Sequence, residues 1–207
     1  MSLYNRYVLP WVIRKSCASK PIRKQREKVV PLAEGRVLEI GAGGGLNFPH
    51  YVKSKVDMVL GLDISAELLD LAEEQAARAR VPFESVLLDA ASIPLERNEV
   101  DTVLVTYSLC SIDDLEPALN EMYRVLKPSG KLIFCEHGVA PDIQVSRMQR
   151  ALTPLWRRFG GGCRLDRDLP GEIEKAGFQI RWLEQMYLPG TWRVVGWNSW
   201  GVAKTSV

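Results

Sequence analysis

Long apolar runs are absent from this 207-residue sequence, and so is any secretory signal. The longest apolar candidate near the start covers residues 7–13 and contains Pro10, whereas a helix that spans a bilayer needs about 20 apolar residues. The sequence also lacks repeats and low-complexity segments. With 46% hydrophobic and 25% charged residues, it has the composition of a globular protein, and we expect a cytoplasmic chain.

Cysteine and histidine are scarce, with four and two residues respectively. No two cysteines have C-x-x-C spacing, and His50 and His137 add no zinc-ligand pattern. We therefore expect no metal site, and we expect reduced thiols. The cysteines are Cys17, Cys110, Cys135 and Cys163.

Acidic residues are almost missing from the start of the chain. Residues 1–30 contain eight Lys and Arg but only one acid, Glu27. We expect residues 1–34 to form a basic arm or lid, which could contact an anionic membrane surface, steer an anionic ligand, or cover the site as a solvated helix face. No RNA-binding module or basic stripe with interleaved aromatic residues is present, so we expect no nucleic-acid partner.

Glycine, by contrast, is concentrated in one place, where it supplies four of the five residues 41–45 after the apolar run 37–40. Fixing glycine costs backbone entropy, so this cluster indicates a backbone that another group approaches closely. A dinucleotide-binding loop has the pattern G-x-G-x-x-G, but Leu46 stands here in place of the third glycine. A NAD-dependent oxidoreductase is therefore a disfavoured alternative.

Apolar runs rich in Val, Ile and Leu alternate with helical periodicity along the rest of the chain. Ser65 and Asp113 are the predicted N-caps of two helices. The alternation predicts a doubly wound, Rossmann-like α/β fold with a mostly parallel seven-stranded sheet, ending in an antiparallel strand pair around residues 188–190. The expected strands cover 37–40, 58–62, 86–88, 100–105, 132–135, 178–186 and 191–204, and shorter helices cover 145–152 and 172–176.

An acidic residue precedes the glycine cluster, and the pattern Glu39-x-Gly41-x-Gly43-x-Gly45 resembles the first motif of class I S-adenosylmethionine-dependent methyltransferases. Aspartates at the ends of the next two expected strands, and the stretches 101–106 and 121–130, resemble further segments of that family in the same order. The resemblance implies a methyltransferase domain over residues 35–207 and S-adenosyl-L-methionine as its cofactor. A protein that binds this cofactor without turnover is a second alternative.

The same resemblance implies which residues bind the cofactor. The glycine loop would meet its amino acid and ribose, Asp63 the ribose hydroxyls, and Asp89 the adenine amino group. Asp63 is alternatively an acid at a helix start, and Asp89 a cap or turn residue. The full predicted set is Glu39, Gly41, Ala42, Gly43, Gly45, Asn47, Asp63, Ile64, Asp89, Ala90, Thr106, Tyr107 and Leu109.

Three later stretches, 109–111, 136–139 and 162–165, resemble those of the membrane-associated thiol methyltransferases of animals and their soluble bacterial relatives. This resemblance implies a small-molecule acceptor, such as a thiol or a lipid headgroup, methylated by in-line displacement. His137 is the predicted general base, or else a histidine that orders its loop. Cys110 and Cys163 either line the acceptor pocket or are small buried hydrophobic residues. The basic stretch 141–170 is the predicted substrate cover.

Overall fold

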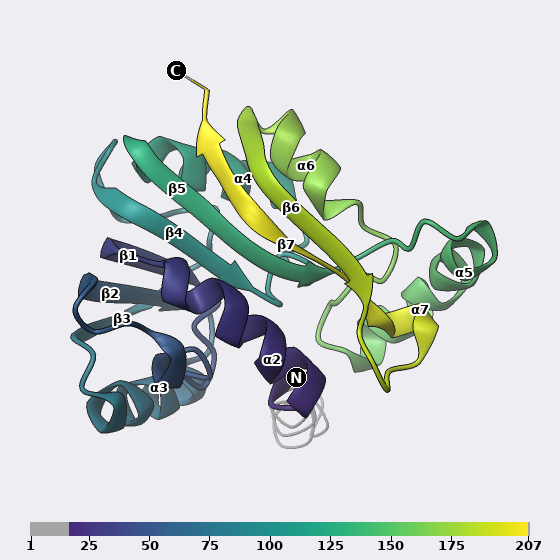
Figure 1. Cartoon of the computed structure of the whole chain (residues 1–207), viewed down its shortest axis with the longest axis horizontal. Helices are drawn as coiled ribbons and strands as arrows, with labels where there is room; N and C mark the ends of the chain where they lie inside the picture. Colours follow the sequence, from purple (N-terminus) through teal and green to yellow (C-terminus); the bar gives the residue numbers. More distant parts are fainter. Residues whose placement is uncertain (1–16, 207) are drawn as a thin grey trace.

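Residues 17–206 are described by the computed structural model, and they build one seven-stranded sheet (Figure 1). Its strand order is β3-β2-β1-β4-β5-β7-β6. Strands β1 to β5 pair in parallel, and β7 runs antiparallel to both of its neighbours. This confirms the predicted topology. The strands are β1 Gly35–Ile40, β2 Val56–Asp63, β3 Phe83–Leu87, β4 Val100–Thr106, β5 Leu126–His137, β6 Phe178–Tyr187 and β7 Trp197–Thr205.

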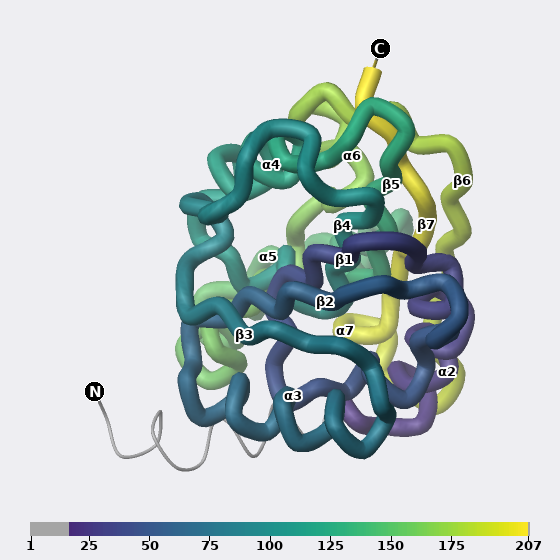
Figure 2. The backbone as a smooth tube through the Cα atoms, turned by 90° about the vertical axis from the view of Figure 1, so that its left-hand side faces the viewer, coloured from purple at the N-terminus to yellow at the C-terminus, as the bar shows by residue number. Residues whose placement is uncertain are grey.

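Helices cover both faces of this sheet. In Figure 2, α4 and α6 lie above the sheet, and α2 and α3 lie below it. Helices α5 and α7 lie beyond the ends of the strands, at the right of Figure 1. None of the described helices is long and apolar enough to cross a membrane. The helices are α2 Lys20–Val29, α3 Ala66–Ala79, α4 Leu115–Val125, α5 Ile143–Phe159, α6 Leu169–Lys175 and α7 Arg193–Gly196.

The core has two halves, because alternate residues of a strand point to opposite faces. Leu38 and Val105 pack in the half that contains α4 and α6. Val37 and Leu104 pack in the half that contains α2 and α3. Side chains at the carboxyl ends of the central strands are therefore fixed between two packed helix layers.

The ends of several elements differ from those predicted. Helix α3 begins at the expected cap, where the Ser65 hydroxyl accepts a hydrogen bond from Leu68 N. Helix α4 begins one residue late, with Asp114 at the N-cap. The Asp113 carboxylate accepts a hydrogen bond from Arg157 of α5. The helix ends at Val125, and Leu126 is already the first residue of β5.

In the last third of the chain, helix α5 is longer and strand β7 is shorter than the sequence predicts. Helix α5 continues through Pro154, which removes one helical N–H but lies beside Thr153, whose hydroxyl donates to the Gln149 carbonyl. Strand β7 starts at Trp197 instead of residue 191, because the short helix α7 intervenes. Both differences lie at the end of the sheet where the predicted substrate cover 141–170 is located (Figure 1).

The predicted basic arm, 1–34, is described only from residue 17, and residues 1–16 lie outside the described part of the chain. Its second half is built into the domain. Val29 and Val30 are fully buried in the core, and Lys28 Nζ lies 4.1 Å from the centre of the Trp200 ring. Helix α2 is thus a packed layer of the fold in addition to any covering role.

Candidate cofactor and acceptor site

The three alternating glycines after β1 share a left-handed backbone but serve different purposes. Gly41, Gly43 and Gly45 have φ of 66°, 53° and 74°. A Cβ on Gly41 would lie 2.2 Å from Ser108 Oγ, and one on Gly45 would lie 2.9 Å from Phe48 Cδ2. A Cβ on Gly43 would meet nothing closer than 3.9 Å. Packing therefore accounts for glycine at positions 41 and 45, whereas a Cβ on Gly43 would make only an ordinary van der Waals contact. The role of the loop in binding a ligand stays a prediction.

Asp63, the last residue of β2, holds this loop in place. Its Oδ2 accepts a hydrogen bond of 2.8 Å from Gly43 N, and its Oδ1 accepts one of 3.0 Å from Ser65 N. The carboxylate thus joins the glycine loop to the start of α3, as the structural alternative proposed. Each oxygen can accept a further hydrogen bond. The predicted ribose role needs those remaining positions and stays a prediction.

Exposed apolar side chains lie next to Asp63 and Asp89 in the sequence. Ile64, Leu87 and Leu88 are 76%, 56% and 40% exposed, and Leu87 pairs with Asp63 across β2 and β3. Such exposed aliphatic groups beside carboxylates suit a flat, partly apolar ring such as adenine. Asp89 is exposed, and its Oδ1 accepts a hydrogen bond of 2.8 Å from Ala91 N, as expected for a turn residue. Its contact with the adenine amino group stays a prediction.

Two alanines of the predicted set are not at the surface. Ala42, in the glycine loop, is 5% exposed, and Ala90, after Asp89, is also 5% exposed. Ala90 packs in the core half that contains α4. We infer that both methyl groups support the loops that carry the site.

Glu39, Asn47 and Thr106, all predicted to contact the cofactor, belong to a buried network. Glu39 accepts hydrogen bonds from Asn47 Nδ2 at 2.8 Å and from the Tyr51 hydroxyl at 2.6 Å. Arg26 of α2 donates to Asn47 Oδ1 at 2.7 Å and to Thr106 Oγ1. The alternation of β1 turns the Glu39 side chain toward α2 and into the protein. The direct contact of these three residues with the cofactor stays a prediction.

Burial dominates the electrostatics of this network. It raises the pKa of Glu39 to about 6, although the hydrogen bonds from Tyr51 and Asn47 and the charge of Arg26 act in the opposite direction. Arg26 is 6% exposed, and among the described residues its Nε has no hydrogen-bond partner. A buried, unsatisfied guanidinium N–H is a place where an anionic group would be stabilised.

The turn after β4 carries the next predicted contacts. Tyr107 has φ of 57°, a strained conformation for a residue with a side chain. Its hydroxyl donates a 2.5 Å hydrogen bond to Asn198 Oδ1, so the ring is fixed on the α2 side. Leu109 is fully buried in the other half of the core. The Leu109 side chain is therefore part of the core, and its predicted contact with the cofactor stays a prediction.

Glu136, near the end of β5, anchors the same turn. Its Oε1 accepts hydrogen bonds from Ser108 N at 2.7 Å and Leu109 N at 3.0 Å. Its Oε2 is buried and has no hydrogen-bond partner among the described residues. Burial raises the pKa of the carboxyl to about 7, against the two N–H groups that lower it. An unpartnered buried carboxylate oxygen of this kind favours a nearby cation.

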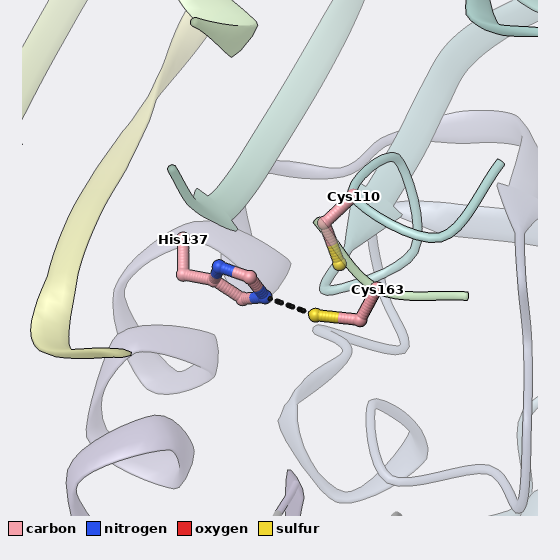
Figure 3. A group of neighbouring side chains, drawn as sticks. All are labelled: Cys110, His137 and Cys163. Carbon is pink, nitrogen blue, oxygen red and sulfur yellow. Dashed lines mark hydrogen bonds between the residues drawn. The ribbon is translucent and has the colours of Figure 1, made fainter. Parts of the chain in front are cut away.

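The two cysteines and the histidine singled out from the sequence come together next to this turn (Figure 3). His137 Nε2 lies 3.0 Å from Cys163 Sγ, and the ligand atoms of Cys110, His137 and Cys163 all lie within 4.8 Å of one another. The sequence spacing predicted no such cluster, because 26 residues separate His137 from Cys163. Tertiary structure alone creates it.

Each member of this cluster changes the proton affinity of the others. The hydrogen bond from the Cys110 thiol, and then His137, lower the pKa of Cys163, although burial opposes them. The same hydrogen bond, followed by burial, raises the pKa of Cys110. Burial would lower the pKa of His137, but Cys163 raises it above the ordinary value. His137 is thus more basic than a free imidazole and lies beside a sulfur atom.

Four side chains that form this region are not among the predicted site residues. The sequence shows Arg26 only as part of a basic arm, and it gives no signal for Tyr51 or Asn198. Glu136 has a usable signal, because it is an acid at the end of a stretch that is apolar from Leu132 to Cys135. Single-sequence patterns do not reveal which distant residues pack behind a loop.

Three features of the chain are typical of enzymes that bind a nucleoside cofactor. They are the glycine loop after β1, the acid at the end of β2, and the mostly parallel sheet with one antiparallel strand. A family model described as "Methyltransferase domain" matches residues 38–134. Thiol S-methyltransferase TMT1B of Rattus norvegicus is 33% identical over 173 residues, which cover 82% of this chain and 70% of that protein. The human TMT1B is 31% identical over 176 residues, which cover 83% and 72%.

Among solved structures, a methyltransferase-like protein of Bacillus halodurans shares the fold with a TM-score of 0.73 and 16% identity, over 89% of this chain and 99% of that one. The chain belongs to the class I S-adenosylmethionine-dependent methyltransferases. It is an enzyme that uses S-adenosyl-L-methionine. This overturns both alternatives, the oxidoreductase and the cofactor-binding protein without turnover.

Proposed function

We propose that this enzyme methylates the sulfur of small-molecule thiols. The observation that carries the proposal is the contact between His137 Nε2 and Cys163 Sγ, which puts an imidazole with a raised pKa next to sulfur at the carboxyl edge of the sheet. Ligands of open α/β sheets bind at that edge. The thiol S-methyltransferases similar to this chain support the same acceptor class.

The residues around the glycine loop suit the cofactor in four places. Gly43 has no neighbour closer than 3.9 Å to a Cβ built on it, Asp63 offers further acceptor positions for the ribose, and the exposed Ile64 and Leu87 offer an apolar surface for adenine. The unsatisfied Nε of Arg26 suits the carboxylate of the methionine part. When bound, the cofactor supplies an electrophilic methyl group on a sulfonium.

The protein's part in the transfer is to position the acceptor and remove its proton. The acceptor sulfur attacks the methyl carbon, so a sulfur–methyl bond forms while the bond to the sulfonium breaks and its electron pair stays with S-adenosylhomocysteine. His137 takes the thiol proton, the role predicted from the sequence. The predicted cover 141–170 supplies α5 and the loop with Cys163, which border the place where the acceptor would bind.

The proposal is tested with acceptors that carry sulfur, oxygen or nitrogen on the same alkyl group, and with a lipid. Initial rates with labelled S-adenosyl-L-methionine are measured for an alkyl thiol, the matching alcohol and the matching amine, and for vesicles of phosphatidylethanolamine. We expect labelled product from the thiol and at most background from the others. Product from the vesicles alone would instead favour a lipid headgroup, and product from the amine alone would reject a thiol-specific site.

The cellular setting is also part of the proposal. We propose a reducing compartment, in keeping with the four free cysteines, and peripheral membrane contact through the basic residues before α2. Those residues, 1–16, lie outside the described part of the chain. Sedimentation with anionic and neutral vesicles tests the contact. Binding to neither kind would reject it.

A further inference from the structure

Three metal-ligating atoms converge at the carboxyl edge of the sheet from three separate segments (Figure 3). Cys110 follows β4, His137 ends β5, and Cys163 lies in the loop between α5 and α6. Their ligand atoms lie within 4.8 Å of one another. With zinc bonds of about 2.0 to 2.3 Å, tetrahedral ligands are roughly 3 to 4 Å apart. A small contraction of the cluster therefore produces zinc-binding geometry.

Backbone and side-chain hydrogen bonds hold two of these segments together. Arg164 N donates to the Cys110 carbonyl at 2.9 Å. The Arg167 guanidinium donates to the carbonyls of Leu109 and Ile112 at 2.5 and 2.7 Å. The loop that carries Cys163 is thus attached to the turn that carries Cys110, through carbonyl groups before, at and after Cys110. Such attachment fixes the two sulfur atoms before any ion binds.

The chemistry of the cluster suits a soft divalent cation. Two thiolates and a neutral imidazole are ligands that zinc prefers, and the two negative charges balance its charge. Glu136 provides a second, independent observation in favour of a cation. Its buried Oε2 has no hydrogen-bond partner among the described residues. Its carboxyl also interacts electrostatically with His137 and Cys163. A cation in the cluster would offset this buried charge.

We propose that Cys110, His137 and Cys163 bind one zinc ion and leave its fourth coordination position open. Zinc sites with three protein ligands commonly keep that position for water or substrate. His137 and Cys163 are only partly buried, so the ion is reachable from solvent.

The open position would take the acceptor thiol as a thiolate, with its proton released to solvent, and this further role rests on the proposed methylation of thiols. A ring nitrogen that binds a metal has no lone pair for a proton. In the zinc-loaded enzyme His137 is therefore a ligand, and its role as base belongs to the metal-free enzyme.

Metal binding is measured without any methyl acceptor. The full-length protein is purified with a reductant, stripped with a chelator and titrated with Co²⁺, whose thiolate complexes show sulfur-to-metal charge-transfer absorption. We expect one equivalent to bind, and zinc to displace it. Cys110→Ser and Cys163→Ser should weaken binding at least 10-fold, whereas Cys135→Ser, a buried thiol of β5 outside the cluster, should bind like the wild type.

Two results would overturn the metal site: no charge-transfer band in the wild type, or equal affinity in all three cysteine variants. Circular dichroism and S-adenosylhomocysteine affinity show whether each variant is folded, and His137→Gln replaces a cysteine variant that is not. The thiol role is tested separately. Thiol methylation that is as fast in stripped as in zinc-loaded enzyme would overturn that role, while methylation that fails in both rejects the proposed function and leaves the metal site standing.

Discussion

Replacing the buried Glu39 with Gln should change how the free energy of unfolding depends on pH. The direction of that change shows whether burial or the charge of Arg26 has the larger effect on the pKa of the Glu39 carboxyl. Burial raises its pKa from 4.5 to about 6 in the folded protein. Between these values the folded state binds more protons than the unfolded state, so wild-type stability falls as pH rises through the window. A shift of this size corresponds to about 2 kcal/mol. The Gln variant has no carboxyl at this position, so its stability should not fall in this way as the pH rises.

The assay is urea unfolding at pH 4.5, 6 and 7.5, followed by tryptophan fluorescence. The difference in unfolding free energy, variant minus wild type, should rise by about 2 kcal/mol from the lowest to the highest pH. Glu84→Gln, at an exposed position of β3, is the matched control and should show a flat difference. If Arg26 outweighed burial, the difference would fall with pH instead, and that result would refute the reasoning.

Three further predictions concern the site. Asp63→Ala should weaken S-adenosylhomocysteine binding by about 1 to 3 kcal/mol in calorimetry, and an unchanged dissociation constant would reject the ribose role. Gly41→Ala should cost about 2 to 4 kcal/mol of stability, because its Cβ collides with Ser108. Gly43→Ala should cost about 1 kcal/mol of stability and mainly weaken cofactor binding. If the two variants lost equal stability and equal cofactor affinity, this division of roles would be contradicted. His137→Ala should lower kcat about 100-fold or more and leave cofactor affinity within about twofold; loss of both together would make His137 structural.

The fold followed from sequence because its signals are local. Strand and helix periodicities differ along the chain, and parallel strands with connecting helices allow few topologies. The Ser65 cap was also predictable, since it depends on a hydrogen bond to Leu68 three residues away. Helix α5 was underestimated because Pro154 is a common stop signal that tertiary packing overrode.

The site was less predictable, because its side chains are arranged by contacts between distant segments. Glu39 precedes the glycine loop as the motif requires, yet Tyr51 and Asn47 bind its carboxylate inside the protein. Cys163 and His137 meet only because β5 and the loop after α5 are neighbours in space. No spacing rule for metal ligands covers such a separation.

The most direct test of the central claim is the product of a single reaction mixture with S-adenosyl-L-methionine and a small alkyl thiol, quantified by mass spectrometry. Methylation at sulfur predicts equal amounts of S-adenosylhomocysteine and of the S-methyl thioether, with neither formed when the thiol is replaced by its alcohol. S-adenosylhomocysteine formed without the thioether, or no product from any thiol, would contradict it.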